Sequence, residues 1–183
     1  MLRTAARRAC LGVVMSTLLV ASGCGGSEPE PLKPMEPEVP ADLCSTVPES
    51  ARTGLVTNSN TDTTGNPTAA CSLRSAPDAK SEVRAVVTWV QLNDDETATQ
   101  VLDSQCRSID RTMFKEQAGF TAAGADQACA ATGTLDGADS TTMAAVSGRQ
   151  VVTVRLSELP PGQQPSLQRS QQMLEGVLSS MAG

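Results

Sequence analysis

The chain has 183 residues, of which 14 are basic and 20 acidic, and it contains no histidine. The acidic balance argues against nucleic-acid binding, which needs a basic face, and the lack of histidine excludes Ser-His-Asp and Cys-His nucleophile systems. Aromatic residues make up only 2% of the chain, so the core must be built from aliphatic side chains that each bury a modest area.

Residues 1–23 have the pattern of a lipoprotein signal peptide. The basic start "MLRTAARR" precedes the uncharged run "ACLGVVMSTLLVASG", and a basic region followed by a short apolar region is typical of a secretory signal. A bilayer-spanning helix takes about 20 apolar residues, and this run is shorter. A permanent transmembrane anchor is therefore the weaker interpretation.

The stretch Ala21-Ser22-Gly23-Cys24 resembles the lipobox of bacterial lipoproteins, in which small residues precede an obligatory cysteine. The resemblance implies that the Cys24 sulfur receives a diacylglyceryl group and that cleavage leaves Cys24 as the new N-terminus. The modification needs cysteine because a thiolate attacks the lipid donor. The alternative is a chance cysteine beside an ordinary cleavage site. We predict a lipid anchor at Cys24 and a position on the extracytoplasmic face of the cell membrane.

Residues 24–41 are predicted to form a lipidated tether rich in proline and glutamate. The stretch "GGSEPEPLKPMEPEVP" offers scarcely any side chain to bury, and such a tract stays extended at about 3.1 Å per residue, reaching roughly 50 Å. Without the arginines of the leader, the excess of acidic over basic residues rises from six to nine. We therefore expect no polybasic membrane patch and no nucleic-acid partner.

Residues 42–183 are enough for a single extracytoplasmic domain. Four cysteines remain in it once Cys10 of the leader and Cys24 are set aside. An even number in an exported domain indicates two disulfides, each contributing about 3 kcal/mol by restricting the unfolded chain. Three pairings are possible, and we favour the one in which each bridge closes a segment that otherwise looks loose. The favoured bridges are Cys44–Cys71 and Cys106–Cys129.

The domain is predicted to begin with a helix, a loop and two strands. Residues 47–55 form a short helix candidate that ends at Gly54, and residues 57–68 have the composition of a loop. Residues 70–75 and 81–92 have strand patterns. The second strand is apolar on both faces, which predicts a central position in the sheet.

A helix is predicted to begin at residues 93–96 and to run to about Gln117. Asn93 or Asp94 can cap its free N–H groups, and the acids that follow suit the helix dipole. Its predicted buried stripe consists of Leu102, Cys106, Ile109 and Met113.

Three strands and a last helix complete the domain. The strands are predicted at residues 127–133, 141–147 and 149–157, with "VSGRQ" as a tight turn between the last two. Ser166 is predicted to cap the helix. The apolar face of that helix consists of Leu167, Leu174, Val177, Leu178 and Met181. This order of elements predicts an α+β fold, with an antiparallel sheet of about five strands, two to three helices packed on it and two disulfides.

Several short motifs of residues 42–181 together resemble a known family. The segment "ADLCSTVPES" is followed by "CSLRS" and a long strand, then by a helix, "GADQACA", a two-strand turn and a C-terminal helix. This order is similar to that of actinobacterial lipoproteins of domain-of-unknown-function family 3558, which typically have a lipobox, a tether, an Asp-x-Cys start and a second cysteine soon after. The tryptophan often found two residues after that cysteine is Leu73 here. The family has no settled activity, so the resemblance implies no catalytic residues.

The residues that could carry chemistry are better explained by local structure. Lys80 beside Ser81 suggests a Ser-Lys dyad, but adjacent residues on an extended strand point apart. Trp89 could line a pocket, although a lone tryptophan on a central strand is more often part of a core. A zinc site is disfavoured because the chain has no CxxC motif and no histidine.

Two clusters could bind a cation. The acids of residues 94–96 stand where a helix N-terminus already explains them. The Asn-x-Asn-x-Asp pattern of residues 58–62 faintly resembles a calcium loop, but Thr63 and Ala69 stand where an EF-hand requires glycine and glutamate. We expect both clusters to be structural and expect no metal or cofactor.

The chain is thus predicted to be exported and tethered, and it has no recognisable catalytic constellation. We expect a non-catalytic binding module for a small ligand or an envelope protein, in contact with the membrane through its N-terminal lipid. The alternative is an accessory or structural subunit of a cell-envelope complex, which holds a partner and has no ligand of its own.

Overall fold

The computed structural model describes residues 42–62, 67–160 and 166–181, all within one structural unit. The predicted signal peptide, the tether and Cys24 lie outside the described residues. In the part of the chain that is described, no helix is both long and apolar enough to cross a membrane.

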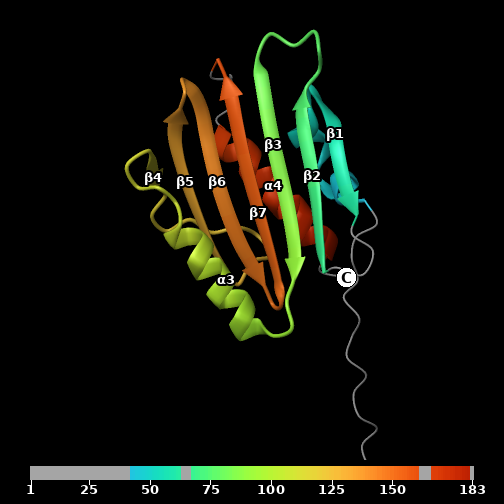
Figure 1. The fold of residues 1–183 in the computed structure, drawn as a ribbon. Helices are drawn as coiled ribbons and strands as arrows, with labels where there is room; N and C mark the ends of the chain where they lie inside the picture. Colours follow the sequence, from blue (N-terminus) through green and yellow to red (C-terminus); the bar gives the residue numbers. More distant parts are fainter. Residues whose placement is uncertain (1–41, 63–66, 161–165, 182–183) are drawn as a thin grey trace, which may run out of the picture. The chain divides into compact units, whose positions relative to one another are not determined.

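The described chain forms one antiparallel sheet with helices against both of its faces (Figure 1). The strands are β1 (Leu55–Asp62), β2 (Thr68–Ser75), β3 (Glu82–Gln91), β4 (Phe114–Glu116), β5 (Gln127–Leu135), β6 (Ala138–Ser147) and β7 (Gln150–Leu159). The helices are α1 (Leu43–Thr46), α2 (Glu49–Arg52), α3 (Asp95–Arg107) and α4 (Ser166–Met181). The strands are arranged in the order β1-β2-β3-β7-β6-β5-β4. The predicted α+β class is confirmed, and so is the central position of β3.

The two faces of the sheet are covered by different helices (Figure 1). Helix α4 crosses one face against β6 and β7, and α1 packs on the same side against β1 and β2. We call this side the back face. Helix α3 lies against β5, β6 and β7 on the opposite side, which we call the front face.

The main core fills the back face. Alternate residues of β3 point there, among them Val87 and Trp89, which are fully buried. The indole N–H of Trp89 donates to the side chain of Gln150 at 3.3 Å, so the prediction that Trp89 is a core residue is confirmed. Helix α4 covers these strands with Met173, Leu174, Val177 and Leu178. The disulfide Cys44–Cys71 joins α1 to β2 inside this core.

A smaller core joins α3 to the front face. Ala98 and Leu102 of the helix pack on Ala144, Val146 and Val151. The helix has 13 residues and is therefore about 20 Å long, whereas a strand of ten residues such as β3 extends over about 33 Å. Helix α3 therefore leaves part of the front face uncovered.

The prediction of about five strands is wrong, because the sheet has seven. Strand β1 replaces the first half of the loop predicted at residues 57–68. Residues 57–60 are polar and exposed and resemble a loop in composition, but as an edge strand β1 pairs through its backbone with β2. Strand β4 lies inside the helix that was predicted to reach Gln117, and it pairs with β5.

The helix boundaries differ from the prediction for local reasons. Helix α3 ends at Arg107, where Ser108 caps it with both its N–H and its hydroxyl on the Gln105 carbonyl, at 3.2 and 2.8 Å. Met113 therefore lies outside the helix and is 46% exposed. The helix predicted at residues 47–55 corresponds to the shorter α2, which begins after Pro48, and α1, which ends at Thr46, was not predicted. The prediction of two to three helices is therefore wrong, because the described residues form four.

Two tight turns connect the last three strands, and α4 follows them. The predicted turn between β6 and β7 is present, with Gly148 at φ 52°. The turn between β5 and β6 has positive φ at both Asp136 and Gly137, as an Asp-Gly hairpin requires. Ser166 is the first helical residue of α4, and its hydroxyl forms a hydrogen bond with that of Thr141 at 2.7 Å.

Candidate binding groove

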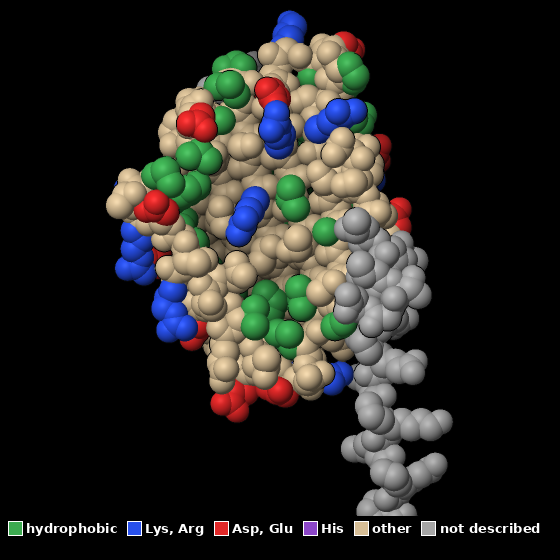
Figure 2. Space-filling view, in the orientation of Figure 1, with side chains coloured by type: hydrophobic (Ala, Val, Ile, Leu, Met, Phe, Trp, Pro, Cys, Tyr) green, Lys and Arg blue, Asp and Glu red, His purple; other side chains and the backbone are tan. Residues whose placement is uncertain are grey.

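The uncovered part of the front face forms an open groove of about 400 Å³. Its floor is made by β3, β7 and β6, and one wall is made by the end of α3 and residues 108–114. Figure 2 shows basic side chains over the middle of this face and hydrophobic side chains gathered toward the side of β4 and β5. The volume lies in the range of about 300–1,000 Å³ that is usual for ligand pockets.

A disulfide fixes the wall of the groove to the sheet. Cys106 lies in the last turn of α3 and is bonded to Cys129 of β5, with the two Cα atoms 6.0 Å apart. Immediately after the helix, the carboxylate of Asp110 accepts hydrogen bonds from the N–H and the hydroxyl of Thr112 at 2.8 and 2.6 Å. This local turn redirects the chain onto β4.

Gly133 lets this wall lie directly on the sheet. It pairs with Phe114 of β4 and with Ser140 of β6. A Cβ atom at Gly133 would stand 2.2 Å from the carbonyl oxygen of Met113. The wall approaches β5 this closely only because the position has no side chain.

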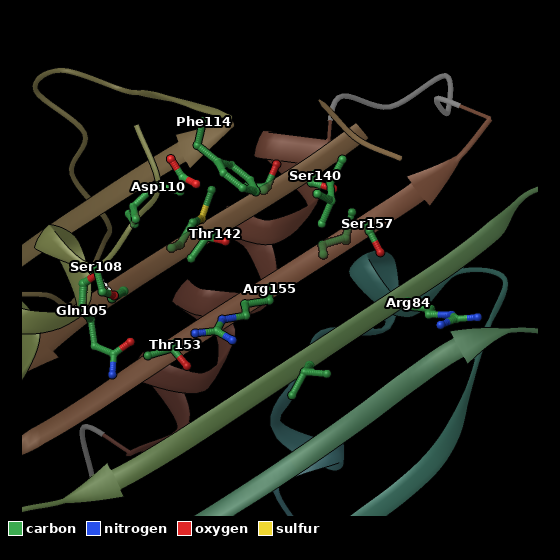
Figure 3. A pocket seen from close by; sticks show the side chains of 17 residues that line it. Arg84, Gln105, Ser108, Asp110, Phe114, Ser140, Thr142, Thr153, Arg155 and Ser157 are labelled. Atoms are coloured by element: carbon green, nitrogen blue, oxygen red, sulfur yellow. Dashed lines mark hydrogen bonds between the residues drawn. The ribbon is translucent and has the colours of Figure 1, made fainter. Parts of the chain in front are cut away.

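The strand register places one arginine on the floor of the groove. Arg155 of β7 lies opposite Val86 of β3 and Thr142 of β6. Figure 3 shows its guanidinium extended along the floor toward Thr153, on the side of the groove where Gln105 of α3 lies. The hydroxyl of Thr153 forms a hydrogen bond with that of Thr88.

Several polar groups of the groove are unpartnered. Within the described ranges, the ion pairs are Arg84–Glu82 and Arg111–Glu116, so Arg155 has none. The side chains of Gln105 and Thr142 likewise form no hydrogen bond to another described residue. Arg155 is exposed and the other two are half-buried, which leaves their N–H and O–H groups available to a ligand.

The charges that line the groove are unevenly distributed. Arg84 lies at the rim, where Figure 3 shows its side chain directed away from Arg155, and it is paired with Glu82. Asp110 lies at the wall, where the hydrogen bonds from the Thr112 hydroxyl and N–H lower the pKa of its carboxyl. The groove therefore has one unpaired positive charge on its floor and one acidic side chain at its wall. The carboxylate of that side chain already accepts two hydrogen bonds from Thr112.

A second hollow, of about 230 Å³, adjoins the groove. Val86, Gln105, Thr153 and Arg155 line both. Arg155 and Gln105 therefore stand where the two hollows meet.

The structure accounts for the residues singled out from the sequence. Both predicted disulfides are present in the favoured pairing. Only Cys106–Cys129 adjoins the groove, whereas Cys44–Cys71 lies in the core of the back face. Cys24, the predicted lipidation site, lies outside the described residues.

The other candidates have structural roles. Ser81 donates to a carboxylate oxygen of Glu158 at 3.4 Å rather than pairing with Lys80. The carboxylate of Asp94 caps α3 by accepting from the N–H and the hydroxyl of Thr97 at 2.7 and 2.8 Å, and these bonds lower its pKa. Asn60 lies on β1 rather than in a calcium loop. Among the described residues, no cluster of three or more acidic, cysteine or histidine side chains could hold a metal ion.

Sequence reasoning did not find the residues of the groove. Arg155 stands between Val154 and Leu156 and follows the alternation of the predicted strand, which places it on the face opposite to the apolar residues. That alternation does not show which part of α3 lies across from Arg155, and because the helix was predicted to continue to Gln117, the open space beside Gln105 was not expected.

Comparison with known proteins finds no relative: no protein-family model, no curated protein and no solved structure matches this chain. The resemblance to family 3558 therefore stays a prediction. The class that the fold and the groove define is an α+β protein with two disulfides and a ligand-sized groove on the less covered face of its sheet. Its function has to be inferred from that geometry.

Proposed function

We propose that the protein is a membrane-anchored extracytoplasmic lipoprotein that binds a ligand in the groove of the front face. The observation that carries the binding role is the combination of an open groove of about 400 Å³ with unpartnered donors from Arg155, Gln105 and Thr142. Pockets that bind small molecules combine apolar walls with a few polar groups of this kind.

The export and the anchor are supported by separate features. The sequence before Cys24 has the order of a lipoprotein signal. The disulfides Cys44–Cys71 and Cys106–Cys129 suit a compartment in which thiols are oxidised. On this proposal the acyl chains hold the protein at the membrane, and the acidic, proline-rich segment separates the domain from the lipid surface.

The anchor is tested by the variant Cys24→Ala. In cells given a labelled fatty acid, the wild-type protein should carry the label and fractionate with membranes. The variant should lose both the label and its normal location. Labelling of the variant would contradict the proposed anchor.

The second candidate is an accessory subunit that holds a protein partner. The observation that favours it is that two apolar residues of the groove are exposed and could receive a partner's side chains: Val86 on the floor is 40% exposed, and Leu135 at the end of β5 is 42% exposed. Native mass spectrometry of the protein purified from its own host distinguishes the two. A bound small molecule supports the ligand-binding role, and a stoichiometric protein with an empty groove supports the accessory role.

Two variants show whether a bound molecule occupies the groove. Thr142→Phe fills the floor beside Arg155 and should remove the small molecule from the mass spectrum. Ser72→Phe is the matched control, because Ser72 lies opposite Val86 on the same face but does not line the groove. Equal retention in both variants would place the molecule elsewhere and contradict the proposed site.

A further inference from the structure

We propose that the ligand of the groove is an amphiphile with one anionic head group, a carboxylate or a phosphate, bound at Arg155, and with an apolar segment directed toward Phe114. This proposal rests on the proposed function, because it assigns a ligand class to the same groove.

The charge of Arg155 is the first support. The chain as a whole carries a net charge of −6, yet this arginine stands on the floor of the groove with no carboxylate within ion-pair distance among the described residues. A guanidinium presents several N–H donors in a planar fork that matches a carboxylate or a phosphate. The missing counter-charge is therefore one that a ligand can supply.

The neighbouring donors strengthen the same site. Thr142 stands directly opposite Arg155 on the adjacent strand. Gln105 lies on the wall, and like Arg155 it lines both the groove and the second hollow. A hydroxyl and an amide N–H also donate hydrogen bonds to anions, although these bonds are weaker than those of a guanidinium. An anion above Arg155 would thus meet donors from β6, β7 and α3.

The opposite end of the groove is apolar. Ile109 and Phe114 contribute half-buried side chains from the wall, and Leu135 is 42% exposed at the end of β5. Figure 3 shows the Phe114 ring projecting from β4 into the groove, apart from Arg155. An apolar segment laid there would gain about 25 cal/mol for each Å² of apolar surface that it removes from water.

Asp110 gives the ligand its orientation. Its carboxylate lines the same wall as Phe114, and its lowered pKa keeps it negatively charged. A second anion at that end would be repelled, so the head group belongs at Arg155 and the apolar segment at the wall.

The test is isothermal titration calorimetry of the purified protein with octyl phosphate and octanoate, which carry the two candidate head groups on the same short chain. Inorganic phosphate supplies the head without the chain, octanol supplies the chain without a charge, and octylammonium reverses the charge. We expect octyl phosphate, octanoate or both to bind, and each of the other three to bind more weakly.

The site is tested by a matched pair of charge variants. Arg155→Gln should weaken octyl phosphate binding about tenfold or more, since it removes a charged hydrogen bond. Arg155→Lys keeps the charge but loses the planar fork, so it should bind with intermediate affinity. Arg74→Gln is the control, because Arg74 lies on the same face opposite Arg84 but outside the groove, and its affinity should change less than about twofold.

The outcomes separate this inference from the proposed function. If octanol or octylammonium binds as well as the anions, and Thr142→Phe abolishes that binding, the groove is a ligand site but the anionic class is wrong. Equal affinities for Arg155→Gln and Arg74→Gln would also overturn the inference. Failure of both anionic probes to bind overturns it as well. The proposed binding role is overturned by different results: a native protein that carries a protein partner with an empty groove, or a bound molecule that Thr142→Phe and Ser72→Phe retain equally.

Discussion

Val86 and Val87 are neighbours on β3, yet they belong to different parts of the molecule. Val87 is fully buried on the back face under the helices, whereas Val86 is 40% exposed on the floor of the groove. The back face is covered by α4, α1 and α2, whereas α3 is the only helix of the described residues that lies on the front face. The comparison shows that the back face holds most of the buried core, whereas the front face keeps an open groove.

Each face also has its own disulfide, and removing them should have the largest effects. The bridged residues are 27 positions apart in Cys44–Cys71 and 23 apart in Cys106–Cys129, so loop closure alone predicts a loss of about 3–4 kcal/mol for either bridge. The double variant Cys44→Ala/Cys71→Ala should lose more, because both half-cystines are at most 3% exposed and their removal also leaves a cavity.

Urea unfolding and ligand titration distinguish the two bridges. Cys106→Ala/Cys129→Ala should unfold at higher urea than the back-face variant, but it should bind octyl phosphate less well than wild type because the wall is released. If Cys44→Ala/Cys71→Ala were more stable than Cys106→Ala/Cys129→Ala, the back face would not contribute more to stability than the front face, which would contradict the comparison.

The two valines give the next largest effect. Val87→Ala should lower the free energy of unfolding by about 2–3 kcal/mol, because it removes two buried carbon atoms and leaves a cavity under α4. Val86→Ala is the matched control on the same strand and should cost less than about 1 kcal/mol, since its side chain is already partly in water. Similar losses in chemical unfolding would show that the front face contributes to stability as much as the back face does.

The sequence predicts the back face better than the front face. The alternation in β7 and the apolar stripe of α4 come from burial on one side, which leaves a periodic signal, and the apolar residues on both sides of β3 indicated an interior strand. The groove of the front face leaves a weaker signal, because side chains that stand in water are not constrained to be apolar. Strand β1 was missed for the same reason: residues 57–60 are polar and exposed, and the strand pairs with β2 through its backbone.

The groove was missed because its wall depends on where α3 ends. The stripe that includes Leu102 and Cys106 does continue to Ile109 and Met113 in the sequence, but Ser108 and the Asp110–Thr112 turn compete locally with the helix. The Asp136–Gly137 pair was a usable signal for the hairpin between β5 and β6. The contact between Gly133 and Met113 could not be predicted, because it joins segments that are brought together only by the fold.

Disturbing the contact between Gly133 and Met113 should have a smaller effect, on the wall of the groove. Gly133→Ala should cost about 1–2 kcal/mol, since its Cβ meets the Met113 carbonyl and a loop can shift to relieve the clash. Hydrogen exchange of residues 108–116 should become faster, and octyl phosphate should bind more weakly.

Gly176→Ala is the back-face counterpart of this variant. A Cβ atom there would stand 2.2 Å from the Pro48 ring, so stability should fall while binding in the groove stays unchanged. If Gly133→Ala leaves both the exchange of residues 108–116 and the binding unaltered, Gly133 does not position the wall.

The smallest expected effect is the pH dependence of the stability that Asp94 and Asp110 contribute at the two ends of α3. Asp94 starts α3 and Asp110 follows it, and hydrogen bonds from Thr97 and Thr112, respectively, lower the pKa of each carboxyl in the folded protein. An aspartate of an unfolded chain has a pKa of about 3.9. Because the folded pKa is lower than the unfolded one, the stabilisation by each carboxylate is complete above the unfolded pKa of about 3.9. It is lost as the pH falls through the folded pKa.

The variants Asp94→Ala and Asp94→Asn separate this charge from the cap itself. In urea unfolding, the stability difference between wild type and Asp94→Ala should be constant near neutral pH and should shrink as the pH falls below about 3.9. Asp94→Asn keeps an oxygen that accepts the Thr97 N–H but cannot titrate in this range, so its stability relative to Asp94→Ala should not depend on this carboxyl. A wild-type advantage over Asp94→Ala that grows on acidification would mean that the carboxyl has a raised pKa, and would contradict the role of Asp94 as an ionised cap at the start of the helix that builds the groove.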